Sequence, residues 1–158
     1  LFRLRGILEI VEPFYQYVVI DNPPGLSYLS INSLVGSTHV VIPCQLEAPS
    51  IEGLTSALKT IQSVQRQHNP RLQFLGILPT MCDFRQQEQN EFLASLRGQY
   101  NSLILTPISR RADVSYANSE GLDIFSFKPA RRSDQLMSAN PATQEFAHVA
   151  EEIRQRMG

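Results

Sequence analysis

The hydrophobic residues of the chain follow two alternating spacings. From Leu4 to Val11 apolar residues recur three or four positions apart, which is typical of an amphipathic helix, and Pro13 ends that pattern. Elsewhere, short apolar runs are typical of buried strands. The runs that predict strands are residues 17–20, 39–43, 74–78, 103–105 and, at a sheet edge, 124–127.

Amphipathic helices are predicted between these strands, at residues 26–35, 51–61 and 92–100, and after the last strand, at residues 141–157. Ser27 and Ser50 can cap the first two of them, and Asn140-Pro141 can begin the last. Strands that alternate with helices are typical of βαβ units. We therefore predict one α/β domain over residues 1–158, with a mostly parallel sheet of four or five strands and helices on both faces.

Composition and charge exclude few functions. The 158 residues suffice for one domain, and a formal net charge of −1 gives no overall field that demands a nucleic acid or a membrane as partner. No apolar run approaches the roughly 20 residues of a membrane span. Cys44 and Cys82 are not at metal-ligand spacing. Because the first residue is Leu1 rather than Met, we expect the chain to be a piece of a longer protein.

The stretch YVVIDNPPG places a carboxylate, Asp21, at the end of a predicted strand. In open parallel sheets, ligands bind beyond the carboxyl ends of the strands. One interpretation is that Asp21 only caps the next helix or a turn. The other is that it meets a cation or a nucleophilic water, while Pro23 and Pro24 fix the backbone and Gly25 allows it to approach a phosphate.

Further motifs follow this stretch along the chain. The Asp-x-Pro-Pro motif precedes a helix that carries an Asn, then come Pro-x-Gln-x-Glu and Glu-Gly-Leu, and later a Thr-Met-x-Asp turn at residues 80–83. In this combination the chain resembles the ParA/Soj family of partition ATPases, relatives of the MinD positioning ATPases. The matching positions before that turn are Asp21, Pro23, Pro24, Asn32, Pro43, Gln45, Glu47, Glu52, Gly53 and Leu54.

The resemblance implies a P-loop NTPase-like fold and a site for ATP and Mg²⁺. It implies that Asp21 faces the Mg²⁺ and the γ-phosphate, and that Pro24 and Gly25 form the moving part of a switch. The residues that it places around the adenine are Thr80, Met81, Pro107, Ser109 and Arg110. At position 109 the family commonly has a proline, and its Glu-Ala-Pro-Ser is replaced here by residues 116–119, Tyr-Ala-Asn-Ser.

The sequence contains no phosphate-binding P-loop. That motif is Gly-x-x-x-x-Gly-Lys-Ser/Thr, and the only lysines of the chain are Lys59 and Lys128, neither of which follows a glycine. In the family, the P-loop lies upstream of the segment that matches residue 1. We therefore expect this chain to form an incomplete fold that lacks the N-terminal P-loop strand. We expect the full-length protein to be an ATPase and this fragment alone to be inactive.

Two classes of function stay open at this point. The first is a cytoplasmic, nucleoid-associated ATPase that partitions or positions DNA or another large cargo. The resemblance implies that it dimerises with ATP and works with a ParB-like activator or cargo adaptor; we favour DNA over the membrane that a MinD-like protein would use. The second is an interaction module without catalysis. The residues that could contact DNA, or simply form a solvated surface, are Lys59, Arg66, Arg71, Arg110 and Arg111.

Overall fold

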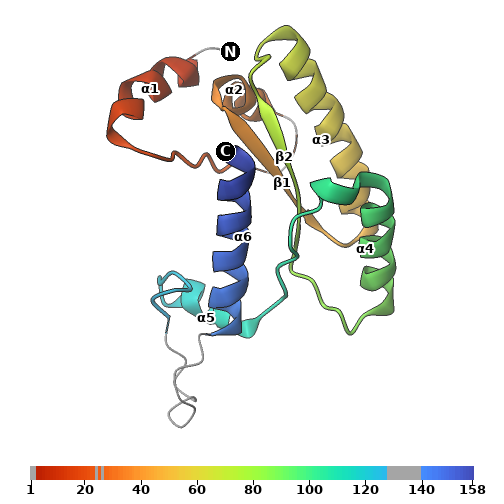
Figure 1. The fold of residues 1–158 in the computed structure, drawn as a ribbon. Coiled ribbons are helices and arrows are strands. Elements are labelled where there is room, and N and C mark those ends of the chain that lie inside the picture. The colour runs from red at the N-terminus through yellow and green to blue at the C-terminus, as the bar shows by residue number, and fades with distance from the viewer. Residues whose placement is uncertain (1–2, 24, 26, 128–139) are drawn as a thin grey trace. The chain divides into compact units, whose positions relative to one another are not determined.

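The computed structural model describes residues 3–23, 25, 27–127 and 140–158. The chain, drawn as a ribbon in Figure 1, divides into two compact units. The first consists of Leu1–Ile42 and Ala48–Gly76, and the second of Pro43–Glu47 and Ile77–Gly158. Strands β1 (His39–Gln45) and β2 (Gln73–Thr80) each contribute their first half to one unit and their second half to the other.

In its described residues, the first unit contains three α-helices and the first halves of both strands. Its helices are α1 (Arg3–Val11), followed by a 3₁₀ turn at Glu12–Phe14, then α2 (Tyr28–Gly36) and α3 (Ala48–Gln67). The Ser27 hydroxyl accepts a hydrogen bond from the Ser30 amide and so caps α2, as predicted. At the other end of α2, Gly36 lies against α1, where an added Cβ would come within 3.2 Å of Leu8 Cδ1.

The core of the first unit lies where α2 and α3 pack on the strands. Val35, Ile61, Val64 and Leu72 are buried together, and the partly buried residues around them are Ile31, Leu34, Val40, Ile42 and Phe74. The Asn69 side chain, in the turn after α3, donates hydrogen bonds to the carbonyls of Leu34 and Ser37 at 3.0 and 2.7 Å. This amide ties the start of β2 to the end of α2.

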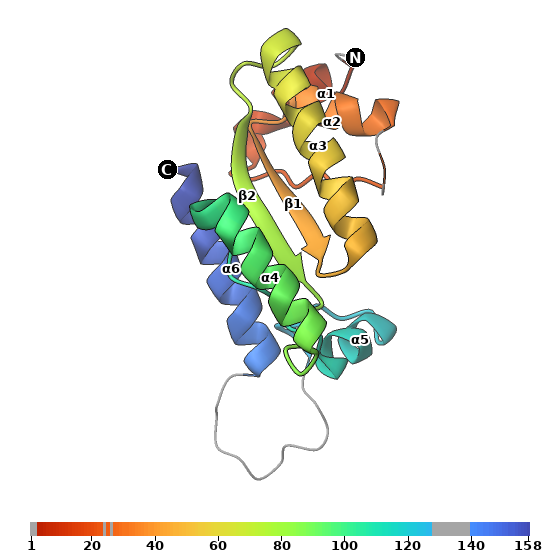
Figure 2. The ribbon, with the colours of Figure 1, turned by 90° about the vertical axis from the view of Figure 1, so that its right-hand side faces the viewer.

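The sheet is parallel, and α3 makes the crossover from β1 to β2 (Figure 2). In the second unit, two parallel bridges join β2 and its continuation to a later segment of the chain, Ile77 to Ile104 and Cys82 to Ser109. The structure is therefore an α/β fold with parallel pairing, as the alternating pattern predicted.

The second unit adds the remaining helices. These are α4 (Gln87–Tyr100), a 3₁₀ turn at Asn101–Leu103, α5 (Ala112–Ser119) and α6 (Pro141–Met157). Helices α4 and α6 lie on opposite sides of the second half of β2 (Figure 1). Ile77, Cys82, Leu96 and Leu105 are almost completely buried between these elements. Asn140 caps α6, because its side-chain oxygen accepts from the Ala142 amide at 3.0 Å.

The predicted strand at residues 17–20 is not formed, which corrects the sequence analysis. The segment has no regular secondary structure, and Tyr17, Val18 and Val19 face solvent, with Val19 92% exposed. A strand needs a neighbour to receive its backbone groups. Among the described residues, none of the named strands or bridges includes this segment.

Three other predictions also need correction. Residues 124–127 form a turn rather than an edge strand, because the Asp123 carboxylate accepts from the amides of Phe125 and Ser126. Residues 103–105 contain a single bridge position, Ile104, after a 3₁₀ turn. Helix α3 begins at Ala48, so Ser50 lies inside it instead of capping it. Helix α5 was not predicted.

Candidate functional site

The candidate site begins at the carboxyl end of β2, in the second unit. Thr80 is the last residue of β2, and Met81 follows in a left-handed conformation with φ +53°, which is uncommon for a residue other than glycine. The Met81 side chain is about half exposed, and its sulfur accepts a hydrogen bond from Gln45 Nε2 at 3.4 Å. Gln45, the last residue of β1, and Met81, the residue after β2, therefore lie together at the carboxyl ends of the two strands.

Residues 104–111 run beside β2 and bring the second group of predicted residues to this end. The amides of Leu105 and Ile108 donate to the carbonyls of Ile77 and Pro79, both at 2.9 Å. Further along, the Arg110 amide donates to the Cys82 carbonyl at 2.8 Å. Pro107 and Ser109 are half-buried, and Arg110 is exposed. The predicted adenine-side residues, Thr80, Met81, Pro107, Ser109 and Arg110, thus come from two adjacent segments of one unit.

Two carboxylates from α6 hold the other edge of this segment. Glu152 accepts from the Thr106 amide at 2.9 Å. Glu145 accepts from the Ser109 amide at 2.9 Å, from the Ser109 hydroxyl at 3.0 Å and from the Arg111 guanidinium at 2.6 Å. The segment is therefore hydrogen-bonded on one side to β2 and on the other to α6.

These contacts change the acidity of the groups involved. Burial by itself would raise the pKa of Glu145, but hydrogen bonds from Arg111 and Ser109 outweigh it and lower the pKa below its ordinary value. Burial alone would likewise raise the pKa of Glu152, but hydrogen bonds from Thr106 and Arg156 outweigh it and lower the pKa. Burial, with smaller effects of Glu145 and Cys44, raises the pKa of Cys82 to about 11. Both carboxylates are therefore charged at neutral pH, and Cys82 is a neutral thiol.

The acid of the Thr-Met-x-Asp turn has a local role. Asp83 receives two hydrogen bonds from the Arg85 guanidinium, both at 2.8 Å, and these bonds lower the pKa of Asp83. The Asp83 amide donates to Gln89 on α4. This carboxylate is therefore engaged in organising the turn between β2 and α4.

Asp21 and Gly25 belong to the first unit. Asp21 is exposed, in the segment without regular structure. Gly25 has φ +95°, and the Gly25 carbonyl accepts from the Ser30 hydroxyl at 3.0 Å. An added Cβ at Gly25 would meet nothing within 4 Å, so the backbone angle alone favours glycine there. Pro24 lies outside the described residues.

A magnesium ion fits Asp21 only as one carboxylate ligand of a larger set. The described residues contain no group of three His, Cys, Asp or Glu side chains placed to hold a metal. Mg²⁺ in nucleotide sites commonly keeps several waters and takes one or two carboxylates plus phosphate oxygens. An exposed carboxylate such as Asp21 is compatible with that mode of binding.

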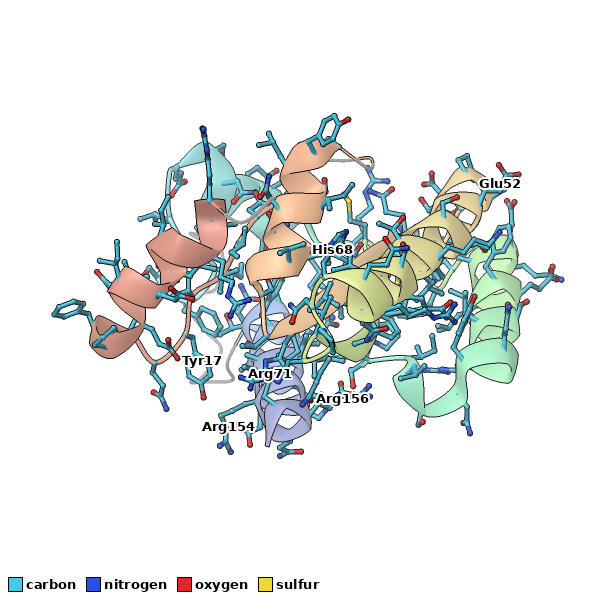
Figure 3. All side chains as sticks on the ribbon, turned by 90° about the horizontal axis from the view of Figure 1, so that it is seen from above. Tyr17, Glu52, His68, Arg71, Arg154 and Arg156 are labelled. Carbon is cyan, nitrogen blue, oxygen red and sulfur yellow. The ribbon has the colours of Figure 1, made fainter. Side chains whose placement is uncertain are left out.

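The predicted basic residues occupy both units. Lys59 and Arg66 are exposed on α3, and Arg71 is exposed in the turn that follows. Lys59 also lines a surface hollow of about 380 Å³. Figure 3 shows His68, another lining residue, at the opposite end of α3 from Glu52. The complete lining is Ile31, Lys59, Thr60, Ser63, Val64, Gln67 and His68. In the second unit Arg110 is exposed, whereas Arg111 is bound to Glu145.

Comparison with known proteins identifies the family. A family model described as an AAA domain matches residues 1–74. The chromosome-partitioning ATPase Soj of Thermus thermophilus is 33% identical over 144 residues, which are 90% of this chain and 54% of that protein. The chain belongs to the ParA/Soj-type family. It spans about half the length of the curated relatives that it matches.

Solved structures support the fold expected of a ParA/Soj-type chain. A variant of McdA from Cyanothece in complex with ATP has a TM-score of 0.79 at 18% identity, covering 96% of this chain and 56% of that one. Cobyrinic acid a,c-diamide synthase from Mycobacterium smegmatis, with an ATP analog and magnesium bound, has a TM-score of 0.63 at 34% identity, covering 68% of this chain and 45% of that one. The fold of this chain is P-loop NTPase-like.

Glu145 and Glu152 were not predicted from the sequence of this ParA/Soj-type chain. A signal for them was present, since they are seven residues apart on α6 and so lie on one face. The buried residues Ala142 and Val149 belong to the same side of the helix. Charged residues that recur beside a buried stripe indicate polar groups that need partners inside the protein.

No helix among the described residues is long and apolar enough to cross a membrane.

Proposed function

We propose that this chain is the part of a partition or positioning ATPase that supplies the switch aspartate and the base side of the ATP site. The observation that carries the proposal is the grouping of five predicted residues at the carboxyl end of β2 in a chain of the ParA/Soj-type family. In open parallel sheets this end is where nucleotides bind. The five residues are Thr80, Met81, Pro107, Ser109 and Arg110.

The chemistry of this proposal assigns the first unit to the phosphates. Asp21 would supply one carboxylate toward Mg²⁺ and the water that attacks the γ-phosphate, and bound Mg²⁺ would neutralise the charge that develops on the phosphates. Pro24 and Gly25 would let the backbone after Asp21 move as ATP is bound and hydrolysed. The left-handed conformation of Gly25 is compatible with a turn that few other residues could adopt. The P-loop would come from another part of the complete protein.

Partners follow from the same proposal. The complete protein would form a homodimer with ATP and bind DNA nonspecifically, in the cytoplasm and on the nucleoid, with a ParB-like activator or cargo adaptor. The exposure of Lys59, Arg66, Arg71 and Arg110 supports contact with phosphates, which are bound through surface cations. Arg111 would contribute less, because its guanidinium is already paired with Glu145.

The test is to change Asp21 in the complete gene product. We expect Asp21→Ala to abolish ATP turnover while the far-UV circular dichroism and the melting temperature stay unchanged, because Asp21 is exposed and outside the core. Asn22→Ala, at the neighbouring exposed position, is the matched control and should keep the parent rate. Turnover by Asp21→Ala at the parent rate would assign Asp21 to a turn and refute this proposal.

A further inference from the structure

The segment that carries Pro107, Ser109 and Arg110 has no regular strand structure of its own. Its conformation must therefore be fixed by partners outside the segment. On the β2 side, the partners are backbone carbonyls of Ile77, Pro79 and Cys82. On the other side, where a further strand would receive the remaining amides, the acceptors are the two carboxylates of α6.

The amides of residues 105–110 can be accounted for one by one. Those of Leu105, Ile108 and Arg110 donate toward β2 and its continuation. Pro107 has no amide hydrogen. The two that remain belong to Thr106 and Ser109, and they donate to Glu152 and Glu145. The carboxylates thus receive the amides on the side of the segment away from β2.

Of the two, Glu145 lies nearer to the predicted base contacts. It accepts three hydrogen bonds from Ser109 and Arg111, on either side of Arg110 in the sequence. Hydrogen bonds to a charged acceptor are stronger than neutral ones, and this carboxylate is only 22% exposed. Removing it would leave the Ser109 amide and the Arg111 guanidinium without this acceptor. The loss would be destabilising, because water reaches half-buried donors too poorly to replace the hydrogen bonds.

We propose that Glu145 is a positioning residue for the nucleotide base: it fixes the backbone of residues 107–110 in the conformation that accepts the base, without touching the nucleotide itself. This inference rests on the proposed function. It also explains how a serine can replace proline at position 109. A proline there restricts the backbone by its ring, whereas Ser109 gains the restriction from two hydrogen bonds to Glu145.

The experiment compares two ligands in the complete gene product. Binding of a nonhydrolysable ATP analog and of inorganic tripolyphosphate, which lacks the base, is measured by calorimetry for the parent, Glu145→Ala and Glu145→Gln. For Glu145→Ala we expect the dissociation constant of the ATP analog to rise by about tenfold or more, and that of tripolyphosphate to change by less than about twofold. Glu145→Gln keeps one acceptor oxygen and should give an intermediate loss.

The control is Glu151→Gln, on the same helix, where the carboxylate is exposed and pairs with Arg154 at the surface. It should bind both ligands like the parent. Hydrogen exchange without nucleotide gives a second readout: residues 104–111 should exchange faster in Glu145→Ala than in the parent.

The possible failures are distinguishable. If the parent binds neither ligand, the proposed function fails, whatever the result of the hydrogen-exchange measurement. If the parent binds and Glu145→Ala weakens both ligands equally, or neither, Glu145 does not position the base and this inference is overturned. Parent-like exchange at residues 104–111 in Glu145→Ala would overturn it as well.

Discussion

At the scale of single residues, Glu152 shows how one carboxylate can link pH to the stability of a loop. It joins the Thr106 amide to Arg156, at 2.9 and 2.7 Å, and these contacts lower its pKa. A carboxyl group with a lowered pKa in the folded state stabilises the protein above its unfolded pKa, near 4.3. That stabilisation is lost as the pH falls through the lower, folded value.

We therefore expect Glu152→Gln to be less stable than the parent by about 1–2 kcal/mol at pH 7, since a hydrogen-bonded charge is lost. The difference should shrink as the pH falls below about 4. Urea unfolding at several pH values measures it. A gap for Glu152→Gln that stays constant with pH would contradict the assigned contacts.

The positions of candidate-site residues were predictable where a local motif carries them. The apolar run predicts β2 clearly, and Thr80 ends this strand while Met81 follows it. Glu145 could not be assigned in this way, because its partners, Ser109 and Arg111, are more than thirty positions away. A contact of that kind depends on how α6 packs in the second unit, and no short stretch of sequence encodes it.

At the scale of elements, α6 carries both carboxylates and its start is fixed by Asn140. The Asn140 oxygen accepts from the Ala142 amide, but its Nδ2 is buried with no acceptor among the described residues. Asn140→Ala should lower the free energy of unfolding by about 1 kcal/mol, because the cap is lost. Chemical denaturation measures it, and Gln144→Ala, exposed on the same helix, is the control.

Asn140→Asp makes this prediction sharper. Aspartate keeps the accepting oxygen and adds negative charge at a helix N-terminus, where it is favourable. It should be at least as stable as the parent at pH 7. If Asn140→Asp and Asn140→Ala were destabilised equally, capping would not be what Asn140 contributes.

Elements were predicted well where the signal lies within the element itself. Ser27 before α2 and Asn140-Pro141 before α6 mark true helix starts, because a cap acts on the next few amides alone. The apolar runs at 17–20 and 124–127 predicted strands that do not form, because a strand also depends on a neighbouring strand. At 124–127, the local turn made by Asp123 prevails. Helix α5 has little apolar periodicity and one buried residue, Ala117, so its pattern gave no signal.

At the scale of the whole molecule, the alternation of strands and helices was enough to predict the α/β class and the parallel sheet. The number of strands was overestimated, since β1 and β2 are the named strands of the described residues and the later segment contributes isolated bridges. Pattern alone reveals which segments could be strands. Which of them become strands depends on which segments come to lie side by side in the fold.

The segment after α1 gives the last prediction, which concerns the behaviour of the 158-residue chain on its own. Phe14 and Tyr15 are 77% and 64% exposed, and Val19 is 92% exposed. Exposed apolar side chains on a backbone without ladder partners favour association with other chains. We therefore expect the isolated chain to associate with increasing concentration, as measured by light scattering after size-exclusion chromatography.

Val19→Lys should reduce this association, because it removes an exposed apolar side chain and introduces a charged one that is costly to bury against a second copy. Asn22→Lys, also exposed in the same segment, adds the same charge but removes no apolar surface, and should reduce it less. The comparison separates a hydrophobic cause from a purely electrostatic one. An isolated chain that stays monomeric at all concentrations would show that these exposed side chains do not drive association, whatever covers them in the complete protein.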